Sequence, residues 1–307
     1  FVVLNARDAQ QRGATILNRT RVVSARREGG LWRIETFDEK SGQTGVYTAR
    51  MLVNASGPWV DTVLSGVFGR NNVHNVRLVQ GSHTIVPKLN DGEHAFILQN
   101  DDRRIIFAYP YQDNYTLIGT TDVELHGTPD VCAASADEVS YLCRAVNRYF
   151  RREVTAQDVV YRYAGIRPLF DDGSNNPSQI TRDYVLRISG EPGTAALLSV
   201  FGGKITTYRS LAERAVDALR PWFPQLGPCW TAAAALAGGD LGPGGFSGLL
   251  QQAAGDYPWL PRPLLCALAR RHGAHLQRVL ADADGLAALG TDFGAGLYAR
   301  EVDYFVE

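Results

Sequence analysis

Short apolar runs separated by glycine and polar turns mark the beginning of the chain. The first 13 residues have the pattern of a helix that ends at Gly13. Runs rich in β-branched and aromatic residues then predict strands at 14–23, 31–37 and 45–49. The apolar residues 51–53 predict a short buried strand that leads into a glycine turn at 54–58. This order of elements favours a sheet domain in which a helix follows the turn.

The pattern changes between residues 78 and 122. Alternating apolar and polar positions predict four strands, joined by turns rich in Asp, Asn and Gly, at 78–86, 95–98, 104–111 and 115–119. Such a succession of short strands is typical of an antiparallel meander with one face in water. The sequence therefore predicts a second, antiparallel sheet.

Helical periodicity follows this sheet. Ser135 with Glu138 three residues later predicts a capping box at a helix start. The helix behind it places five apolar residues on one face, namely Val139, Leu142, Cys143, Val146 and Phe150.

Further strands are predicted at 159–163, 184–188 and 195–201, and a helix at 206–219. That helix has an apolar stripe formed by Ala212, Ala215, Val216 and Leu219. The glycine-rich stretch 238–248 predicts a loop, and 263–271 with 275–280 predict a small helical module after it.

Composition limits the classes of protein that the chain can belong to. Of 307 residues, 45% are hydrophobic and 21% charged, which is enough apolar material for a globular core in about two domains. The net charge of −1 argues against a nucleic-acid-binding surface, which usually shows as an excess of basic residues. The four cysteines have no zinc-site spacing and are expected to be buried thiols. No apolar stretch approaches the length of a membrane span. Because an apolar run starts at Phe1, we expect the chain to begin inside a natural domain.

The turn Asn54-Ala55-Ser56-Gly57-Pro58 is the first candidate for chemistry. A strand, a glycine and a proline at a helix start can direct backbone N–H groups at an anion. Gly57 would also allow a cofactor to come close to the backbone. A plain strand-to-helix turn would have the same sequence, so the pattern alone leaves both readings open.

The stretch 201–209 is a second strand that leads through a glycine turn into a helix start. An apolar strand ends in Gly202 and Gly203, and a helix start with Lys204, Ile205 and Thr207 follows. The helix dipole and the lysine would both favour an anion, such as a reduced flavin. The spacing of a phosphate-binding P-loop is absent. A structural cap with a solvated lysine remains the alternative.

Two arginines and a histidine complete the set of candidates. Arg167 and Arg182 lie beside predicted strands, and together with Lys204 they suit a phosphate group. His83 lies in an apolar strand and could accept a proton from a hydroxyl group. The alternatives are arginines that are exposed or in salt bridges, and a histidine whose hydrogen bonds only support the sheet. The pair His272 and His275 lacks a third ligand nearby in the sequence, so no metal site is predicted.

Taken together, these motifs resemble the membrane-associated FAD-dependent glycerol-3-phosphate dehydrogenases, within the wider group of proteins similar to D-amino-acid oxidase. The most specific matches are the run 199–209 and Gly119-Thr120-Thr121-Asp122. Further matching stretches lie at 54–61, 81–83 with 86–87, 95–100, 165–169 and 180–184, and all the matches together span about half of the chain in the expected order.

The resemblance implies roles for the candidate residues. His83 would lie by the C2 hydroxyl group of glycerol 3-phosphate, as base or orienting group. Arg167, Arg182 and Lys204 would hold the phosphate and flank the flavin, with Thr207 nearby. The groups that would touch FAD are Ala55, Gly57, Pro58, Gly202, Gly203, Lys204 and Ile205. The electrons would pass to a membrane quinone, and the protein would be cytoplasmic, peripheral on the inner face of the cytoplasmic membrane.

One departure from this family is expected to matter. Its members open with a G-x-G-x-x-G turn that binds the FAD pyrophosphate, and no such turn occurs in these 307 residues. We therefore expect the chain alone to bind FAD weakly or not at all and to be inactive. Without the leading strand of this domain, one edge of its sheet should be open or apolar surface should be exposed. We expect a homo-oligomer to cover it.

Other functions fit the same motifs. A glycerol-3-phosphate oxidase that uses oxygen would share every one of them, and a non-redox module that binds a phosphorylated ligand would share the cations. An amine oxidase is less favoured, since three phosphate-suited cations exceed its need.

The fold class that we expect is α+β: a partial, Rossmann-like FAD-binding domain, an antiparallel substrate-binding sheet and a C-terminal helical domain. The expected boundaries are 1–75 with 160–220 for the discontinuous FAD-binding domain, 76–159 for the sheet with its helix, and 228–307 for the helical domain.

Overall fold

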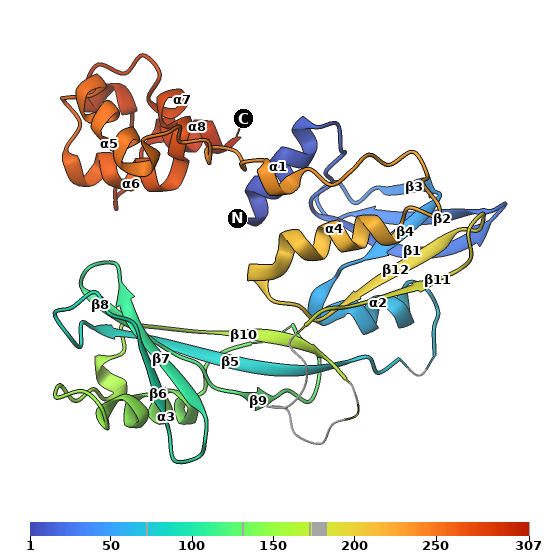
Figure 1. Ribbon diagram of the computed structural model, residues 1–307, viewed down its shortest axis with the longest axis horizontal. Coiled ribbons are helices and arrows are strands. Elements are labelled where there is room, and N and C mark those ends of the chain that lie inside the picture. Colours follow the sequence, from blue (N-terminus) through green and yellow to red (C-terminus); the bar gives the residue numbers. More distant parts are fainter. Residues whose placement is uncertain (72, 131, 172, 174–182, 307) are drawn as a thin grey trace. The chain divides into compact units, whose positions relative to one another are not determined.

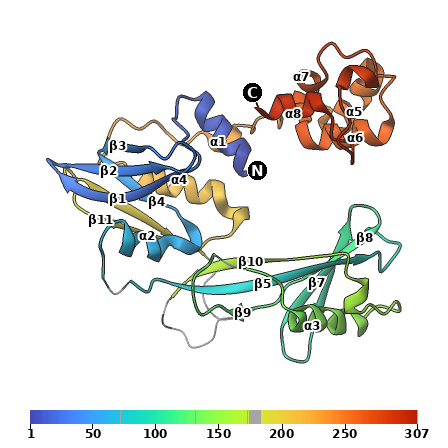
Figure 2. The ribbon, with the colours of Figure 1, turned by 180° about the vertical axis from the view of Figure 1, so that it is seen from behind.

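The computed structural model describes residues 1–71, 73–130, 132–171, 173 and 183–306. It has the expected α+β fold, and the chain divides into two compact units (Figures 1 and 2). The larger unit comprises residues 19–227, and the smaller comprises residues 1–18 and 228–307.

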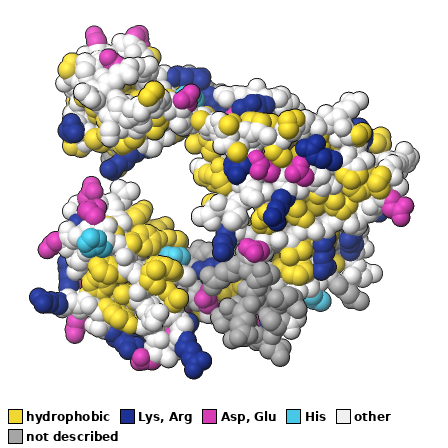
Figure 3. Space-filling view, in the orientation of Figure 1, with side chains coloured by type: hydrophobic (Ala, Val, Ile, Leu, Met, Phe, Trp, Pro, Cys, Tyr) yellow, Lys and Arg dark blue, Asp and Glu magenta, His cyan; other side chains and the backbone are white. Residues whose placement is uncertain are grey.

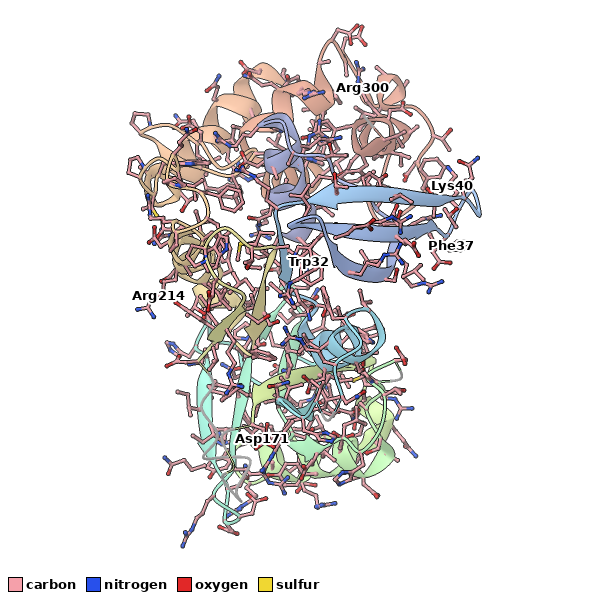
Figure 4. The ribbon with its side chains drawn as sticks, turned by 90° about the vertical axis from the view of Figure 1, so that its right-hand side faces the viewer. Trp32, Phe37, Lys40, Asp171, Arg214 and Arg300 are labelled. Carbon is pink, nitrogen blue, oxygen red and sulfur yellow. The ribbon has the colours of Figure 1, made fainter. Side chains whose placement is uncertain are left out.

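A three-stranded meander opens the larger unit. It consists of β1 (Thr20–Glu28), β2 (Leu31–Asp38) and β3 (Thr44–Ala49), all antiparallel. Strand β1 begins at Thr20, whereas the apolar run predicted a strand from residue 14 to residue 23. Trp32 is 4% exposed, and its indole Nε1 donates a hydrogen bond to the carbonyl of Ala196, 2.8 Å away (Figure 4). This contact ties the meander to the next sheet.

The second sheet has the strand order β11 (Val185–Ser189), β12 (Ala196–Phe201), β4 (Met51–Asn54). Strands β12 and β4 run parallel, and every residue of β12 is buried. Helix α2 (Val60–Gly66) contributes Val60 and Leu64 to the core that this sheet shares with the meander. Because β12 is buried on both faces, its sequence is a continuous apolar run broken only by Ser199.

The third sheet is antiparallel. Its strand order is β10 (Tyr161–Phe170), β5 (Val76–Pro87), β8 (Tyr115–Gly119), β7 (Ile105–Tyr111), β6 (Phe96–Gln99), with β9 (Val123–Glu124) paired to β5. Helix α3 (Ala136–Asn147) covers one face through its apolar side, as Figure 1 shows. The capping box of Ser135 and Glu138 is present, as predicted. The opposite face carries exposed apolar side chains (Figure 3), among them Ile97, Phe107, Tyr161 and Tyr163.

Strand β10 differs from its expected place. The sequence grouped residues 160–220 with the FAD-binding domain, whereas β10 pairs with β5 along its whole length, from Tyr161 opposite Ile85 to Phe170 opposite Val76. Ten consecutive pairs of backbone partners outweigh proximity in the sequence, so β10 belongs to the antiparallel sheet.

Helix α4 (Tyr208–Ala218) forms where predicted, after a short 3₁₀ turn, η3 (Ile205–Thr207). Its expected apolar stripe is not buried: Val216 is 41% exposed, and none of the residues of α4 is in the core. Strand β4 pairs only with β12 among the described residues, and Val53 on it is 49% exposed. Among the described residues, the β4 side of this sheet is therefore unpaired, and apolar side chains of β4 and α4 lie on the surface.

The smaller unit is helical. It contains α1 (Val2–Gln11), α5 (Gly245–Asp256), α6 (Arg262–His272), α7 (Leu276–Leu280) and α8 (Ala299–Val306). The prediction of a loop at 238–248 is wrong at its end, since α5 begins at Gly245. Burial of apolar side chains against α6, centred on Ala253, Leu265 and Leu268, overrides the low helix propensity of glycine there. This unit also contains the 3₁₀ turns η4 (Thr231–Ala233), η5 (Gly273–His275) and η6 (Leu286–Leu289), whereas η2 (Ala156–Asp158) belongs to the larger unit.

A buried carboxylate joins α6 to α8. Glu301 is 1% exposed, and its oxygens contact Nε of Arg271 at 2.6 Å and Nε2 of His272 at 2.5 Å. His275 Nδ1 lies 2.7 Å from the hydroxyl group of Tyr304. Both histidines thus have structural partners, and the described residues contain no metal-ligand cluster.

None of the four cysteines, all of which the structure describes, forms a disulfide, and only Cys143 is buried, which corrects the expectation that all four are. In the described part of the chain no helix combines the length and apolar character needed to cross a membrane.

Candidate functional site

Two glycine turns lie at the same edge of the second sheet. Strands β4 and β12 are parallel neighbours, with Asn54 opposite Ser199, so both chains leave the sheet in the same direction. The turn after β4 leads into the 3₁₀ turn η1 (Gly57–Trp59) and then α2, and the turn after β12 leads into η3 and α4. Ligands of α/β folds bind at this carboxyl edge of the strands.

The turn after β4 is shaped by Asn54. This buried side chain donates from Nδ2 to the carbonyl of Val60 at 3.1 Å and accepts at Oδ1 from Ser56 Oγ at 2.6 Å. Gly57 has φ of 57°, a left-handed conformation that glycine adopts without strain. A side chain at Gly57 would meet no atom within 4 Å, so the space above it is open. Ala55 is exposed and Pro58 half-buried in this turn.

The turn after β12 packs on the antiparallel sheet. Gly202 has φ of 69°, and a Cβ there would lie 3.1 Å from the carbonyl oxygen of Asp183 and 3.4 Å from that of Pro168. The structure therefore brings the backbone of three separate stretches together at Gly202. One of these stretches carries Arg167; the predicted site residue Arg182 lies outside the described residues.

Lys204, Ile205 and Thr207 follow at the helix start. Lys204 is exposed, and Ile205 is 69% exposed. The Thr207 hydroxyl group donates to the carbonyl of Lys204 at 2.9 Å, so it caps its own turn. Gly203, with φ of 103°, closes the turn. This side of the turn is open to solvent or to a ligand.

His83 lies on the face of the antiparallel sheet opposite α3. Its ring occupies the place that a side chain at Gly119 would take: a Cβ on Gly119 would lie 2.6 Å from Nε2 of His83. The ring of Tyr163, which is paired with His83 across the strands, stacks on it with 4.9 Å between centroids and 3° between planes. Gly119 on one neighbouring strand and Tyr163 on the other therefore fix the orientation of the imidazole.

The electrostatic surroundings keep His83 neutral. Burial lowers the pKa of His83 below its usual 6.5, and the positive charge of Arg167 lowers it further, while the backbone of Gly81 opposes the shift without reversing it. The Nδ1 atom of His83 is buried and has no hydrogen-bond partner in the described part of the chain. Nε2 is therefore the nitrogen that a ligand can approach.

Arg167 lies over a second glycine, Gly81, which is on β5 two residues before His83. A Cβ on Gly81 would lie 2.6 Å from Cζ of Arg167, so only glycine leaves room for the guanidinium. Arg167 Nη1 forms an ion pair with Asp122 at 2.9 Å and donates to the carbonyl of Thr121 at 3.3 Å, and Nη2 donates to Thr120 Oγ1 at 2.9 Å. The turn after β8 thus holds the arginine beside His83.

Anchoring residues connect the two sheets. The carboxylate of Asp61 on α2 accepts hydrogen bonds from the backbone and side chain of Asn75 at 2.7 and 2.8 Å, just before β5 begins. Trp59 Nε1 donates to Asp130 at 3.0 Å. Arg77 at the start of β5 pairs with Asp171 after β10 at 3.0 Å, and Figure 4 marks Asp171.

Sequence reasoning missed several groups at this site. The stacking of Tyr163 depends on strand pairing, and the link from Glu138 to the sheet depends on how α3 packs. The roles of Thr120 and Asp122 had a signal, since both belong to the motif at 119–122. Of the predicted residues, His83 and Arg167 come together, whereas Lys204 and Thr207 lie on the turn that touches Pro168.

Comparison with known proteins gives this geometry a context. The family of FAD dependent oxidoreductases, DAO, matches residues 1–209. A glycerol-3-phosphate dehydrogenase from Pseudomonas aeruginosa is 50% identical over 99% of this chain, and a D-erythritol 1-phosphate dehydrogenase from Brucella abortus is 47% identical over all of it. The chain spans 59% and 61% of the length of these two relatives.

A solved structure agrees with these sequence relatives. The glycerol-3-phosphate dehydrogenase from Bacillus halodurans, complexed with FAD, superimposes with a TM-score of 0.75 at 30% identity. The match covers 91% of this chain and 54% of that protein.

Proposed function

The chain belongs to the family of FAD dependent oxidoreductases, and from this premise we propose that it forms the substrate-binding part of an enzyme that oxidises sn-glycerol 3-phosphate to dihydroxyacetone phosphate. The observation that carries the proposal is His83 beside Arg167, each lying over a glycine of the antiparallel sheet. A base kept neutral by burial and by a neighbouring cation suits the removal of a proton from a hydroxyl group of an anionic substrate.

The glycine turns fit FAD as the cofactor. Both lie at the carboxyl edge of parallel strands, and the space over Gly57 is open. We propose contacts to FAD from Ala55, Gly57, Pro58, Gly202, Gly203, Lys204 and Ile205. FAD, when bound, supplies the acceptor for the hydride that leaves the substrate.

The proton of the alcohol goes to Nε2 of His83. Its pKa below the usual value means that the imidazole is neutral, and ready to accept a proton, at neutral pH. Stacking on Tyr163 keeps the ring in one orientation, so its lone pair points in a fixed direction.

The phosphate group is bound by Arg167, Arg182 and Lys204 in this proposal, with Thr207 at the helix start. Arg167 already contacts Asp122, Thr120 and Thr121, which hold the guanidinium in place before a substrate arrives. A cation that is oriented in advance loses less side-chain entropy when it binds an anion.

The test uses a form of the protein extended to the length of its relatives and loaded with FAD. Addition of glycerol 3-phosphate without oxygen should bleach the flavin absorbance, and H83N should slow the bleaching by about 100-fold or more. A flavin that stays oxidised in the unmodified protein would favour the alternative, a module that binds a phosphorylated ligand without redox chemistry. A 307-residue chain that purifies with one equivalent of FAD would contradict our expectation that it binds FAD weakly.

D-erythritol 1-phosphate is the second candidate substrate, since the Brucella relative that carries this activity in its name is 47% identical to the chain. The two substrates share the phosphate and a secondary alcohol and differ in length. The ratio of kcat/KM for the two compounds decides between them.

The electron acceptor and the location are proposals of the same kind. We propose a membrane quinone as acceptor and a peripheral position on the inner face of the cytoplasmic membrane. Oxygen uptake compared with reduction of a quinone analogue distinguishes a dehydrogenase from an oxidase, and binding to lipid vesicles tests the location. Light scattering tests whether a homo-oligomer covers the open edge at β4.

A further inference from the structure

We infer that Glu138 is a positioning residue: from the helix side of the antiparallel sheet, its carboxylate holds the strand and the turn that carry His83 and Arg167 on the opposite side. The inference rests on the proposed function for its catalytic consequence, but the geometry that supports it stands by itself.

Glu138 makes more contacts than a helix cap needs. At Oε2 it accepts hydrogen bonds from Ser135 N and Oγ at 3.0 and 2.9 Å; the first of these, with the bond from Glu138 N to Ser135 Oγ at 3.2 Å, forms the capping box. At Oε1 it accepts from Ser82 Oγ at 2.7 Å and from Thr121 Oγ1 at 2.6 Å, and Gln80 Nε2 donates to Oε2 at 2.9 Å. Glu138 is 8% exposed, and these five hydrogen bonds satisfy its carboxylate.

These contacts connect Glu138 with the strand that carries His83 and with the turn that holds Arg167. Ser82 precedes His83 on β5, and because side chains alternate along a strand, Ser82 faces α3 while His83 faces the other side. Thr121 accepts a hydrogen bond from Ser82 N at 2.9 Å, and the Thr121 carbonyl accepts from Arg167. One carboxylate therefore fixes the distance between β5 and the turn that holds Arg167.

The charge state of Glu138 supports this arrangement. Burial by itself would raise the pKa of Glu138, but hydrogen bonds from Thr121, Ser135 and Ser82 outweigh it and lower the pKa below 4.5. The group is ionised at neutral pH and accepts from every donor around it. A neutral amide of the same shape has one acceptor oxygen instead of two, so it cannot accept all of these hydrogen bonds.

The primary experiment needs no flavin and no substrate. The imidazole of His83 is titrated by NMR in the 307-residue chain and in its E138Q variant, with H83N used for assignment. We expect the pKa of His83 to rise toward 6.5 in E138Q, because β5 and Arg167 lose their fixed separation and the ring gains water. Loss of the negative charge would act in the opposite direction, so a rise cannot come from that change alone.

Two variants separate positioning from helix capping. S135A removes the other half of the same capping box and should lower the melting temperature without moving the pKa of His83. D158N changes a second capping-box carboxylate, Asp158, which bonds Thr155 at the start of η2. It should leave the His83 titration unchanged. Equal shifts in E138Q and S135A would overturn the inference.

T121V provides a second route if E138Q folds poorly. It removes the hydroxyl group between Glu138 and Ser82 but keeps the helix cap, and it should raise the pKa of His83 in the same direction. An unchanged titration in both T121V and E138Q would overturn the inference.

The catalytic readout uses the FAD-loaded form. E138Q should lower kcat/KM for glycerol 3-phosphate by about tenfold or more. The acid limb of the profile of kcat/KM against pH should move to higher pH in this variant. If the unmodified enzyme does not oxidise this substrate, the proposed function fails, while the NMR titration still decides the role of Glu138.

Discussion

The imidazole of His83 lies parallel to the ring of Tyr163, with 4.9 Å between ring centroids and 3° between planes. The two residues are partners across β5 and β10, 80 positions apart in the sequence. Since β5 also pairs with β8, the same row of the sheet places Gly119 on the other side of His83. The imidazole that serves as the base of the proposed reaction is thus oriented by stacking on Tyr163 and fits into the space that Gly119 leaves free.

Removal of the stacking ring should disturb catalysis more than stability. Y163A should lower kcat/KM in the FAD-loaded enzyme by about 2- to 10-fold, the equivalent of a stacked aromatic pair. Y163F keeps the ring and should stay close to the unmodified enzyme. Steady-state kinetics check both variants, and equal losses in the two would show that the hydroxyl group, not the stack, matters.

A methyl group at Gly119 should displace the base. In G119A the new Cβ would overlap the His83 ring, so the imidazole must move, and kcat/KM should fall by about 100-fold. G165A is the matched control for structure, because a Cβ at Gly165 meets no atom within 4 Å. NMR of the imidazole should show a displaced His83 signal in G119A and an unshifted one in G165A.

Activity should extend to lower pH than an unperturbed histidine allows. The reaction needs neutral His83, and its pKa is lowered by burial and by Arg167. Removing the positive charge in R167Q makes the imidazolium less unfavourable, so the acid limb of the profile of kcat/KM against pH should move to higher pH. R167K keeps a positive charge and should shift the limb less. A limb that stays in place in R167Q would contradict the electrostatic account.

The same shift links folding to pH. Because the unfolded chain binds a proton at His83 near pH 6.5 and the folded chain binds it only at lower pH, the free energy of unfolding should rise with pH between the folded pKa and 6.5. Below the folded pKa, this contribution is fully lost. Chemical denaturation of the unmodified chain and of H83N at several pH values measures the difference, which should shrink in H83N.

The helical unit should depend on Glu301. E301A leaves the buried His272 and the partly exposed Arg271 without their carboxylate partner, and loss of hydrogen bonds to a charged group costs about 2 kcal/mol. E301Q keeps the shape and should cost less. Calorimetry that resolves the two units should show a lower melting temperature for residues 1–18 with 228–307, while the unit of residues 19–227 should melt as before.

The sequence by itself determined the local elements and the chemistry of their ends. Alternation predicted the strands of the antiparallel sheet, and Ser135 with Glu138 predicted the start of α3, because periodicity and capping depend on neighbours a few residues apart. The glycine turns at Gly57 and Gly202 were visible for the same reason.

Only the tertiary structure decided which of these groups meet. It placed β10 beside β5, so that Tyr163 stacks on His83 and Arg167 lies over Gly81. It also turned a helix cap at Glu138 into a link to Ser82 and Thr121. The physical reason is that such contacts depend on strand register and on the packing of a helix against a sheet, and these join residues that local periodicity does not connect.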